Sequence, residues 1–250
     1  MDTSRKIKII IIFIGFIMFA GLAIFSFKYF QSSGGVFTQK IPLGEIHGLL
    51  SGESYDATKP DNITLPGVTL KLVSQDVPNI NFTTTSNTDG SFDFKKVPTG
   101  FAYVMKIENN QKPASYYVPY AEKVLLSYGQ KSLNLFPSLN LTESSLRDLK
   151  RQQGLYLYQS LLETYKKDNT HYPVADGNEN ILNTQSFLIT FLKSYVDEIN
   201  FSVNNLIDPL KNRPFVYKSG GLHYWLNAYP ELITDVPLYD KVSNSYLVQH

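Results

Sequence analysis

The chain contains no cysteine, and this absence excludes several kinds of structure. Disulfides, zinc–thiolate sites, iron–sulfur clusters and cysteine nucleophiles all need a thiol. An excess of charge of one sign is also missing, because 23 Lys and Arg stand against 22 Asp and Glu in 250 residues. Nucleic-acid-binding proteins usually carry a basic excess or a basic stripe, so we expect no nucleic-acid partner.

Motifs that carry chemistry are missing as well. The sequence has no Gly-x-Ser-x-Gly turn for a hydrolase serine and no glycine-rich phosphate loop. None of its four histidines has the spacing of a metal-ligand pair. We therefore expect no enzyme activity, no cofactor and no small-molecule substrate.

A long apolar run is present near the N-terminus. Residues 9–27 carry no charge and only one weakly polar side chain, Ser26. As a helix with a rise of about 1.5 Å per residue, this run spans roughly 28 Å, close to the hydrocarbon thickness of a bilayer. We predict a single transmembrane helix over residues 9–30, which makes the lipid bilayer the first expected partner.

Basic residues before the run set the expected orientation, and they are Arg5, Lys6 and Lys8. By the positive-inside rule, the leader of residues 1–8 stays in the cytoplasm and the later domains lie outside the cell membrane. A cleaved signal peptide is the alternative, but its apolar core is usually about 7–15 residues long, with a small-x-small cleavage site after it. No such site follows this run. Prepilin-type processing is not expected, because Ala20 stands where the resemblance to such a leader requires glutamate.

Residues 43–141 show the period-two alternation of β-strands. Leu70 and Leu72 alternate with polar neighbours, and similar short segments recur with turns every 8–12 residues or so. About seven strands are expected, one of them at residues 116–118, and this spacing predicts an all-β sandwich. The Ser- and Gly-containing residues 31–42 are expected to form a flexible linker before it.

Several segments of this region resemble the carboxypeptidase regulatory-like (prealbumin-like) β-sandwich family and the related collagen-adhesin B-type repeats. The matching segments are residues 44–48, 65–72, 88–94 and 97–103. The resemblance implies an accessory module without chemistry of its own, of the kind found in surface stalks, transporters and enzymes.

After residue 141 the apolar spacing changes to three and four. Thr142 is expected to cap a helix near its N-terminus. One face of this helix carries apolar residues at Leu155, Tyr158, Leu162 and Tyr165. A second helix is expected over residues 184–199 and a β-hairpin over residues 214–226. Residues 142–250 therefore predict a small α+β domain, which makes the fold multi-domain.

This second domain resembles the globular head of type II secretion pseudopilins, especially the major pseudopilin. The matching segments are residues 162–165, 168–173, 208–217 and 224–228. In that family the membrane helix runs directly into the head helix, whereas here a sandwich separates them, so the resemblance implies a head fold rather than assembly by helix packing. Some family members bind calcium in the last loop, where the candidate ligands in this chain are Asp235 and Asp240.

Aromatic residues are abundant, with 17 Tyr and 16 Phe beside a single Trp. Four of them cluster in and beside the expected hairpin and form a candidate interaction surface: Tyr217, Tyr224, Trp225 and Tyr229. Aromatic clusters serve as contact hot spots, although they also fill the cores of small domains. We predict a membrane-anchored extracytoplasmic binding or scaffold protein of a bacterial envelope, with the sandwich as a stalk and the head as the module that contacts an envelope or surface protein. The alternative is an accessory subunit of a type II secretion or type IV pilus-like machine.

Overall fold

The computed structural model describes the chain over residues 40–77, 79–175, 180–182, 192, 194–195, 208–210 and 215–250. Residues Leu43–His250 form one compact unit. The expected leader (1–8), the anchor (9–30), nearly all of the linker (31–42) and most of the second helix expected over residues 184–199 lie outside the described residues. Within the described part, no helix combines the length and the apolar character needed to cross a bilayer.

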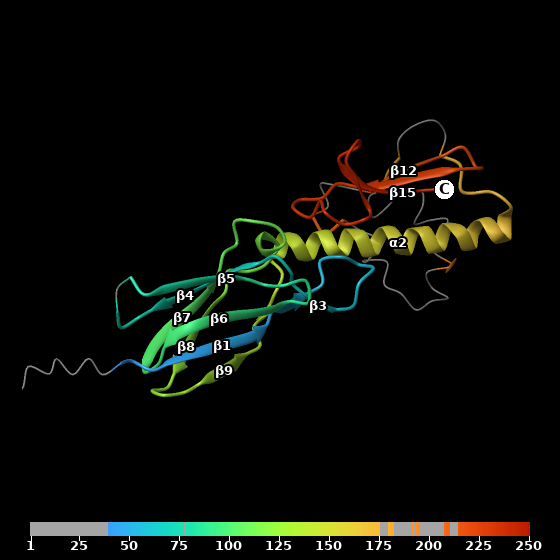
Figure 1. Cartoon of the computed structure of the whole chain (residues 1–250). Helices are drawn as coiled ribbons and strands as arrows, with labels where there is room; N and C mark the ends of the chain where they lie inside the picture. Colours follow the sequence, from blue (N-terminus) through green and yellow to red (C-terminus); the bar gives the residue numbers. More distant parts are fainter. Residues whose placement is uncertain are drawn as a thin grey trace, which may run out of the picture. The chain divides into compact units, whose positions relative to one another are not determined.

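In the described residues before the long helix, the structure has ten strands. They are β1 (Leu43–Leu49), β2 (Ser51–Glu53), β3 (Asn62–Thr64), β4 (Thr69–Ser74), β5 (Asn81–Thr85), β6 (Ser91–Pro98), β7 (Phe101–Ile107), β8 (Ala121–Leu126), β9 (Ser132–Leu135) and β10 (Ser138–Leu139). One sheet has the order β5-β4-β7-β8 and is antiparallel throughout. The opposing sheet has the order β6-β1-β9, and β10-β2-β3 continues beyond it. The expected β-sandwich is confirmed (Figure 1).

The sandwich core follows from the alternation in the sequence. Leu70 and Leu72 on β4 are fully buried, and Lys71 between them is exposed. Phe92 and Phe94 on β6 are also buried, and their rings meet edge to face with centroids 6.0 Å apart. Gly90 makes the turn into β6 with φ of +82°, where a Cβ atom would lie 2.7 Å from the Leu50 carbonyl oxygen.

The prediction of a strand at residues 116–118 is wrong. Ala114–Tyr116 form a short 3-10 helix, labelled η1, and Tyr117 makes only an isolated bridge to Leu141. Both Tyr116 and Tyr117 are buried, although neighbouring residues on a strand point to opposite faces. The turn is what allows two consecutive tyrosines to enter the interior.

The long helix α2 (Glu143–Asn169) begins where the sequence predicts. Thr142 adopts an extended backbone, and its side chain accepts a hydrogen bond from the Ser145 amide at 3.2 Å, which is the expected N-cap. At the other end Thr170 takes the left-handed conformation, and its amide donates to the Lys166 carbonyl. The predicted apolar face is buried in full and comprises Leu155, Tyr158, Leu162 and Tyr165.

A separate five-stranded sheet packs along α2 and completes the head (Figure 1). Its strands are β11 (Asn180–Leu182), β12 (Phe215–Ser219), β13 (Tyr224–Ala228), β14 (Tyr239–Asp240) and β15 (Ser245–Gln249). Their order is β11-β12-β13-β15-β14, and every pair is antiparallel. The expected hairpin is β12–β13, whereas β14–β15 is a second hairpin that the sequence did not predict.

Candidate functional site

The aromatic hairpin of the head divides its residues between two faces. Tyr217 and Tyr224 have no exposed surface, whereas Trp225 is 49% exposed and Tyr229 is 42% exposed. Tyr224 and Trp225 are consecutive on β13, so the pleat of the strand directs them to opposite sides. The interaction surface expected from the sequence is therefore wrong for Tyr217 and Tyr224, which belong to the core.

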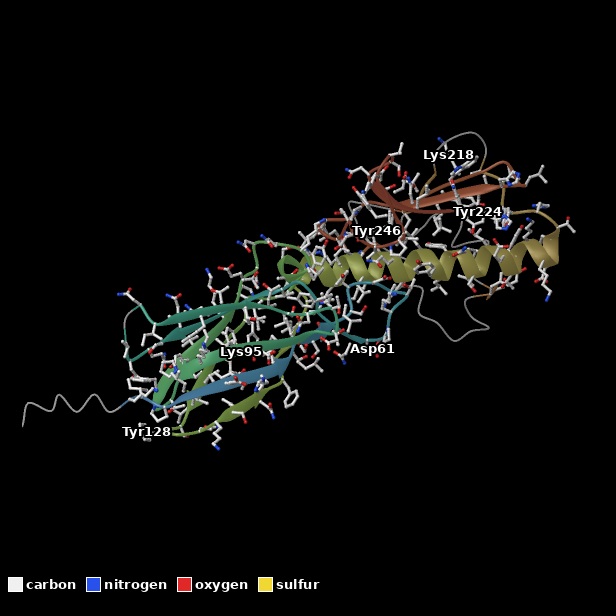
Figure 2. All side chains as sticks on the ribbon, viewed as in Figure 1. Asp61, Lys95, Tyr128, Lys218, Tyr224 and Tyr246 are labelled. Carbon is white, nitrogen blue, oxygen red and sulfur yellow. The ribbon has the colours of Figure 1, made fainter. Side chains whose placement is uncertain are left out.

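The inner face of the sheet shows why these tyrosines are buried. The ring of Tyr224 meets the edge of Tyr172 with centroids 4.7 Å apart and stacks with Tyr217 at 6.2 Å. The Tyr217 hydroxyl donates to the Pro173 carbonyl at 2.8 Å, and burial raises the pKa of Tyr217 to about 12. Figure 2 shows Tyr224 and Tyr246 between the sheet and α2. These rings hold the sheet to the helix.

The outer face of the sheet carries a groove of about 480 Å³. Two rows of cross-strand neighbours form its floor. In one row Trp225 pairs with Lys218 and Gln249, and in the other Asn227 pairs with Val216 and Leu247. Tyr229 and Ser243 complete the lining. Lys218 lies on the side of the sheet away from α2 (Figure 2). We call these eight residues the outer groove.

The polar groups of the outer groove are mostly neutral. In the part of the chain that the structure describes, no hydrogen bond engages the side-chain amide of Asn227 or of Gln249. The lining includes one ammonium group, Lys218, and no carboxylate. Each primary amide offers two donors and one acceptor, so the groove presents an exposed indole flanked by unused hydrogen-bonding groups.

A buried group of charges lies at the other side of the head, against α2. The guanidinium of Arg151 is fully buried and donates to Asp208 at 2.6 Å, to Asp148 at 2.7 Å and to Glu231 at 2.7 Å. Burial lowers the pKa of Arg151, but these hydrogen bonds outweigh it and hold the pKa above its ordinary value. The sequence alone does not reveal this group, because its members are far apart in the chain.

The same charges fix the loop that follows β13. The Asp148 carboxylate accepts hydrogen bonds from the backbone amides of Glu231, Leu232 and Ile233, at 2.7–3.1 Å. Arg147 forms a two-pronged pair with Glu231, and these hydrogen bonds lower the pKa of Glu231 to about 2. Since each carboxylate already has a cation or backbone donors, the group acts as a structural clamp rather than as an acid–base pair.

The sandwich and the head are joined by hydrogen bonds. The Tyr116 hydroxyl donates to Asp235 Oδ1 at 2.5 Å, and the Tyr116 carbonyl accepts from the Ser145 hydroxyl of α2 at 2.7 Å. Further along α2, the Gln152 side chain donates to the Tyr55 carbonyl at 3.0 Å and accepts from the Ala57 amide at 3.1 Å. Loops of the sandwich are thus fastened to both the first and the third turn of α2.

The two calcium candidates have protein partners. Asp235 accepts from Tyr116, while Asp240 accepts from the Val242 and Ser243 amides and closes the β14–β15 turn. Among the described residues, no three or more His, Asp or Glu side chains come together in a way that could hold a metal ion. Calcium binding at Asp235 and Asp240 stays a prediction.

An acidic hollow of about 340 Å³ lies between the β2–β3 loop and α2. Its carboxylates are largely engaged, since Asp56 accepts from the Thr58 amide and hydroxyl at 2.9 and 2.8 Å, and Glu53 accepts from the Leu141 amide at 2.8 Å. The outer groove is therefore the candidate binding site.

Comparisons with known proteins reach only part of the chain. No protein-family model matches it, and no curated protein matches its sequence. The TIE protein of Bacillus anthracis is similar to 40% of this chain, with 20% identity and a TM-score of 0.30, over 17% of its own length. The major pilin BcpA of Bacillus cereus is similar to 40% of this chain, with 18% identity and a TM-score of 0.30, over 30% of its own length. The major pilin SpaD of Corynebacterium diphtheriae is similar to 40% of this chain, with 10% identity and a TM-score of 0.29, over 32% of its own length. The chain thus spans less than a third of these structures, and similarity at this level carries no conclusion about function.

Proposed function

We propose that the chain is a membrane-anchored, extracytoplasmic binding or scaffold protein, in which the sandwich is a spacer and the outer groove is the contact surface. One observation carries the proposal, namely that Trp225 and Tyr229 are about half exposed beside a groove on the solvent side of the head sheet. Tryptophan and tyrosine are the side chains that most often dominate binding energy at contact surfaces. Both rings line one groove, so they form a joint aromatic surface rather than two scattered exposed residues.

The topology of the sandwich supports its use as a spacer. β1 begins where the chain enters the sandwich, and β2 continues it toward β10 and the start of α2. The eleven residues from Leu43 to Glu53 advance about 35 Å at ~3.3 Å per residue. The entry point and the head are therefore at opposite ends of the sandwich, and the hydrogen bonds of Tyr116 and Gln152 keep the two parts together.

The anchor in this proposal is the predicted transmembrane helix of residues 9–30, with residues 1–8 in the cytoplasm. No catalytic step is proposed, because the carboxylates of the head serve the clamp around Arg151. A role as an accessory subunit of a secretion or pilus-like machine would use the same anchor and groove, with another machine component as the partner.

The proposed topology is tested by cysteine labelling, for which the natural chain provides a cysteine-free background. Val242→Cys, at a head position that is 95% exposed, should react with a membrane-impermeant maleimide in intact spheroplasts. Thr3→Cys should react only after the membrane is permeabilised. The reverse pattern, or protection of both positions, would overturn the orientation.

The contact surface is tested by cross-linking in intact cells. The full chain should form a discrete cross-linked species that weakens at least several-fold in Trp225→Ala. Tyr128→Ala is the matched control, because Tyr128 is an aromatic residue of the sandwich that is 60% exposed. Equal cross-linking in both variants would show that the outer groove is not the contact surface, and known secretion components in the cross-linked species would favour the machine-subunit alternative.

A further inference from the structure

The outer groove combines an exposed aromatic ring with neutral hydrogen-bonding groups. Trp225 lies in the middle of the sheet, with Lys218 and Gln249 as its cross-strand neighbours. Asn227 follows two residues later on the same face of β13, and Tyr229 two residues after that. Tyr229 lies one residue beyond the end of β13, so at about 3.3 Å per extended residue the Cα atoms of the two aromatic residues are at most roughly 13 Å apart. The groove therefore presents two ring contacts with an amide between them.

This arrangement suits the chemistry of a sugar chain. A pyranose ring has a face of C–H groups, whose partial positive charge is attracted to the electron-rich face of an indole or a phenol. Its edges carry hydroxyls that both donate and accept, and primary amides are able to satisfy both functions. The Asn227 and Gln249 amides have no hydrogen-bond partner among the described residues, so they are available for this purpose.

Other ligand classes fit the groove less well. A peptide in the extended conformation adds to the edge of a sheet through its backbone, whereas this groove lies on the face. An amphipathic helix needs a continuous apolar groove, and here Val216 and Leu247 are interrupted by Asn227. The lining also has no carboxylate, so it offers a cationic partner no opposite charge.

We infer that the outer groove binds an oligosaccharide chain of the cell's own envelope, with one sugar ring on Trp225 and a later ring on Tyr229. The inference rests on the proposed function, since it needs the head to be outside the membrane and the outer groove to be its contact surface. In the proposed topology the head lies outside the membrane, on the side where the sugar chains of an envelope are found. The open groove predicts weak binding, with a Kd on the order of 0.1–1 mM.

Trp225 is the only tryptophan of the chain, so its fluorescence reports on this groove alone. The full chain in lipid nanodiscs is titrated with maltotetraose, with tetra-N-acetylchitotetraose and with tetragalacturonate, which are neutral, N-acetylated and acidic sugars. We expect a saturable change with at least one of them, and at least 10-fold weaker binding of the corresponding monosaccharide, because one ring cannot reach both aromatic residues. Envelope polysaccharide from the source cells should compete with the bound sugar.

Variants around Trp225 preserve the probe and test the assignment. Asn227→Ala and Gln249→Ala should each weaken binding about 3- to 10-fold, as expected for the loss of one hydrogen bond. Tyr128→Ala, on the sandwich, should bind like the wild type, and thermal unfolding confirms that each variant is folded.

Three results would overturn the inference: no saturable change with any of the three sugars up to about 10 mM, full binding by the Asn227→Ala/Gln249→Ala double variant, or no competition by envelope polysaccharide. If cross-linking in cells still depends on Trp225 while sugars fail to bind, the proposed function stands and only the sugar assignment falls. If neither depends on Trp225, both fall.

Discussion

The hydroxyl of Tyr116, in the sandwich, donates a 2.5 Å hydrogen bond to the carboxylate of Asp235, in the loop that follows β13. This contact bridges 119 positions of the sequence and joins two regions that the sequence presents as separate domains. Burial and the neighbouring Asp235 raise the pKa of Tyr116, which keeps the phenol protonated and able to donate.

Tyr116→Phe and Asp235→Asn should therefore show coupled losses of stability. A hydrogen bond to a charged acceptor contributes about 1.5–3 kcal/mol, so each single variant should lose roughly that amount and the double variant little more. Urea unfolding of the full chain in mild detergent, followed by Trp225 fluorescence, measures the cycle. Additive losses would show that the two side chains act independently.

The Asp235→Asn variant also tests whether Asp235 binds calcium. With the carboxylate committed to Tyr116, the loss in Asp235→Asn should be equal in chelator and in about 1 mM Ca²⁺, a concentration that fills extracellular calcium modules. If calcium stabilises the wild type but not Asp235→Asn, the carboxylate is a metal ligand.

Arg151→Met should be among the most destabilising substitutions in the head. It leaves the buried carboxylates of Asp148 and Asp208 without their cation, and breaking such a pair costs about 3–5 kcal/mol. Arg147→Met is the matched control on the same helix, because the Arg147 side chain is 25% exposed and this variant should lose much less stability than Arg151→Met. Equal losses in the two variants would contradict the clamp.

Sequence reasoning could predict the helix but not this clamp. Arg151 follows Arg147 by four residues and Asp148 by three, which is also the spacing of solvated ion pairs on a helix surface. Their burial depends on Asp208 and on the loop at Glu231, whose sequence separations from Arg151 are 57 and 80 positions. Only the folded chain shows that this loop covers them.

The sequence predicts the β12–β13 hairpin, and it also allows its two faces to be told apart. Successive side chains on a strand point to opposite faces, so Tyr224 and Trp225 cannot share one contact surface. The cross-strand partner of Trp225 is Lys218, a residue that is rarely buried, and this pairing shows which face is outside. The register of the hairpin therefore separates Trp225 from Tyr217 and Tyr224.

Glu231 predicts how the stability of the head depends on pH. Hydrogen bonds from Arg147 and then from Arg151 lower its pKa from 4.5 to about 2, so the folded state binds this proton less readily than the unfolded state. The resulting stability is complete above about pH 4.5 and is lost as the pH falls toward 2.

Glu231→Gln should therefore be less stable than the wild type at pH 7, by about 1–3 kcal/mol, and the difference should shrink between pH 4.5 and pH 2. Unfolding curves at several pH values measure it. Glu143→Gln is the control, because the Glu143 side chain is 94% exposed and its removal should change stability by less than about 0.5 kcal/mol at every pH. A difference for Glu231→Gln that is constant with pH would contradict the lowered pKa.

Two consecutive residues of β13 should separate stability from binding. Tyr224→Ala removes a fully buried ring that packs on Tyr172 and Tyr217, and should lose about 3–5 kcal/mol. Trp225→Ala removes a ring that is 49% exposed, and should lose less than about 1 kcal/mol while abolishing the contacts of the outer groove. Circular dichroism follows unfolding in both variants, because Trp225→Ala has no fluorescent probe. A large loss of stability in Trp225→Ala would mean that its ring supports the sheet, and the exposed aromatic residues would then need no ligand to explain them.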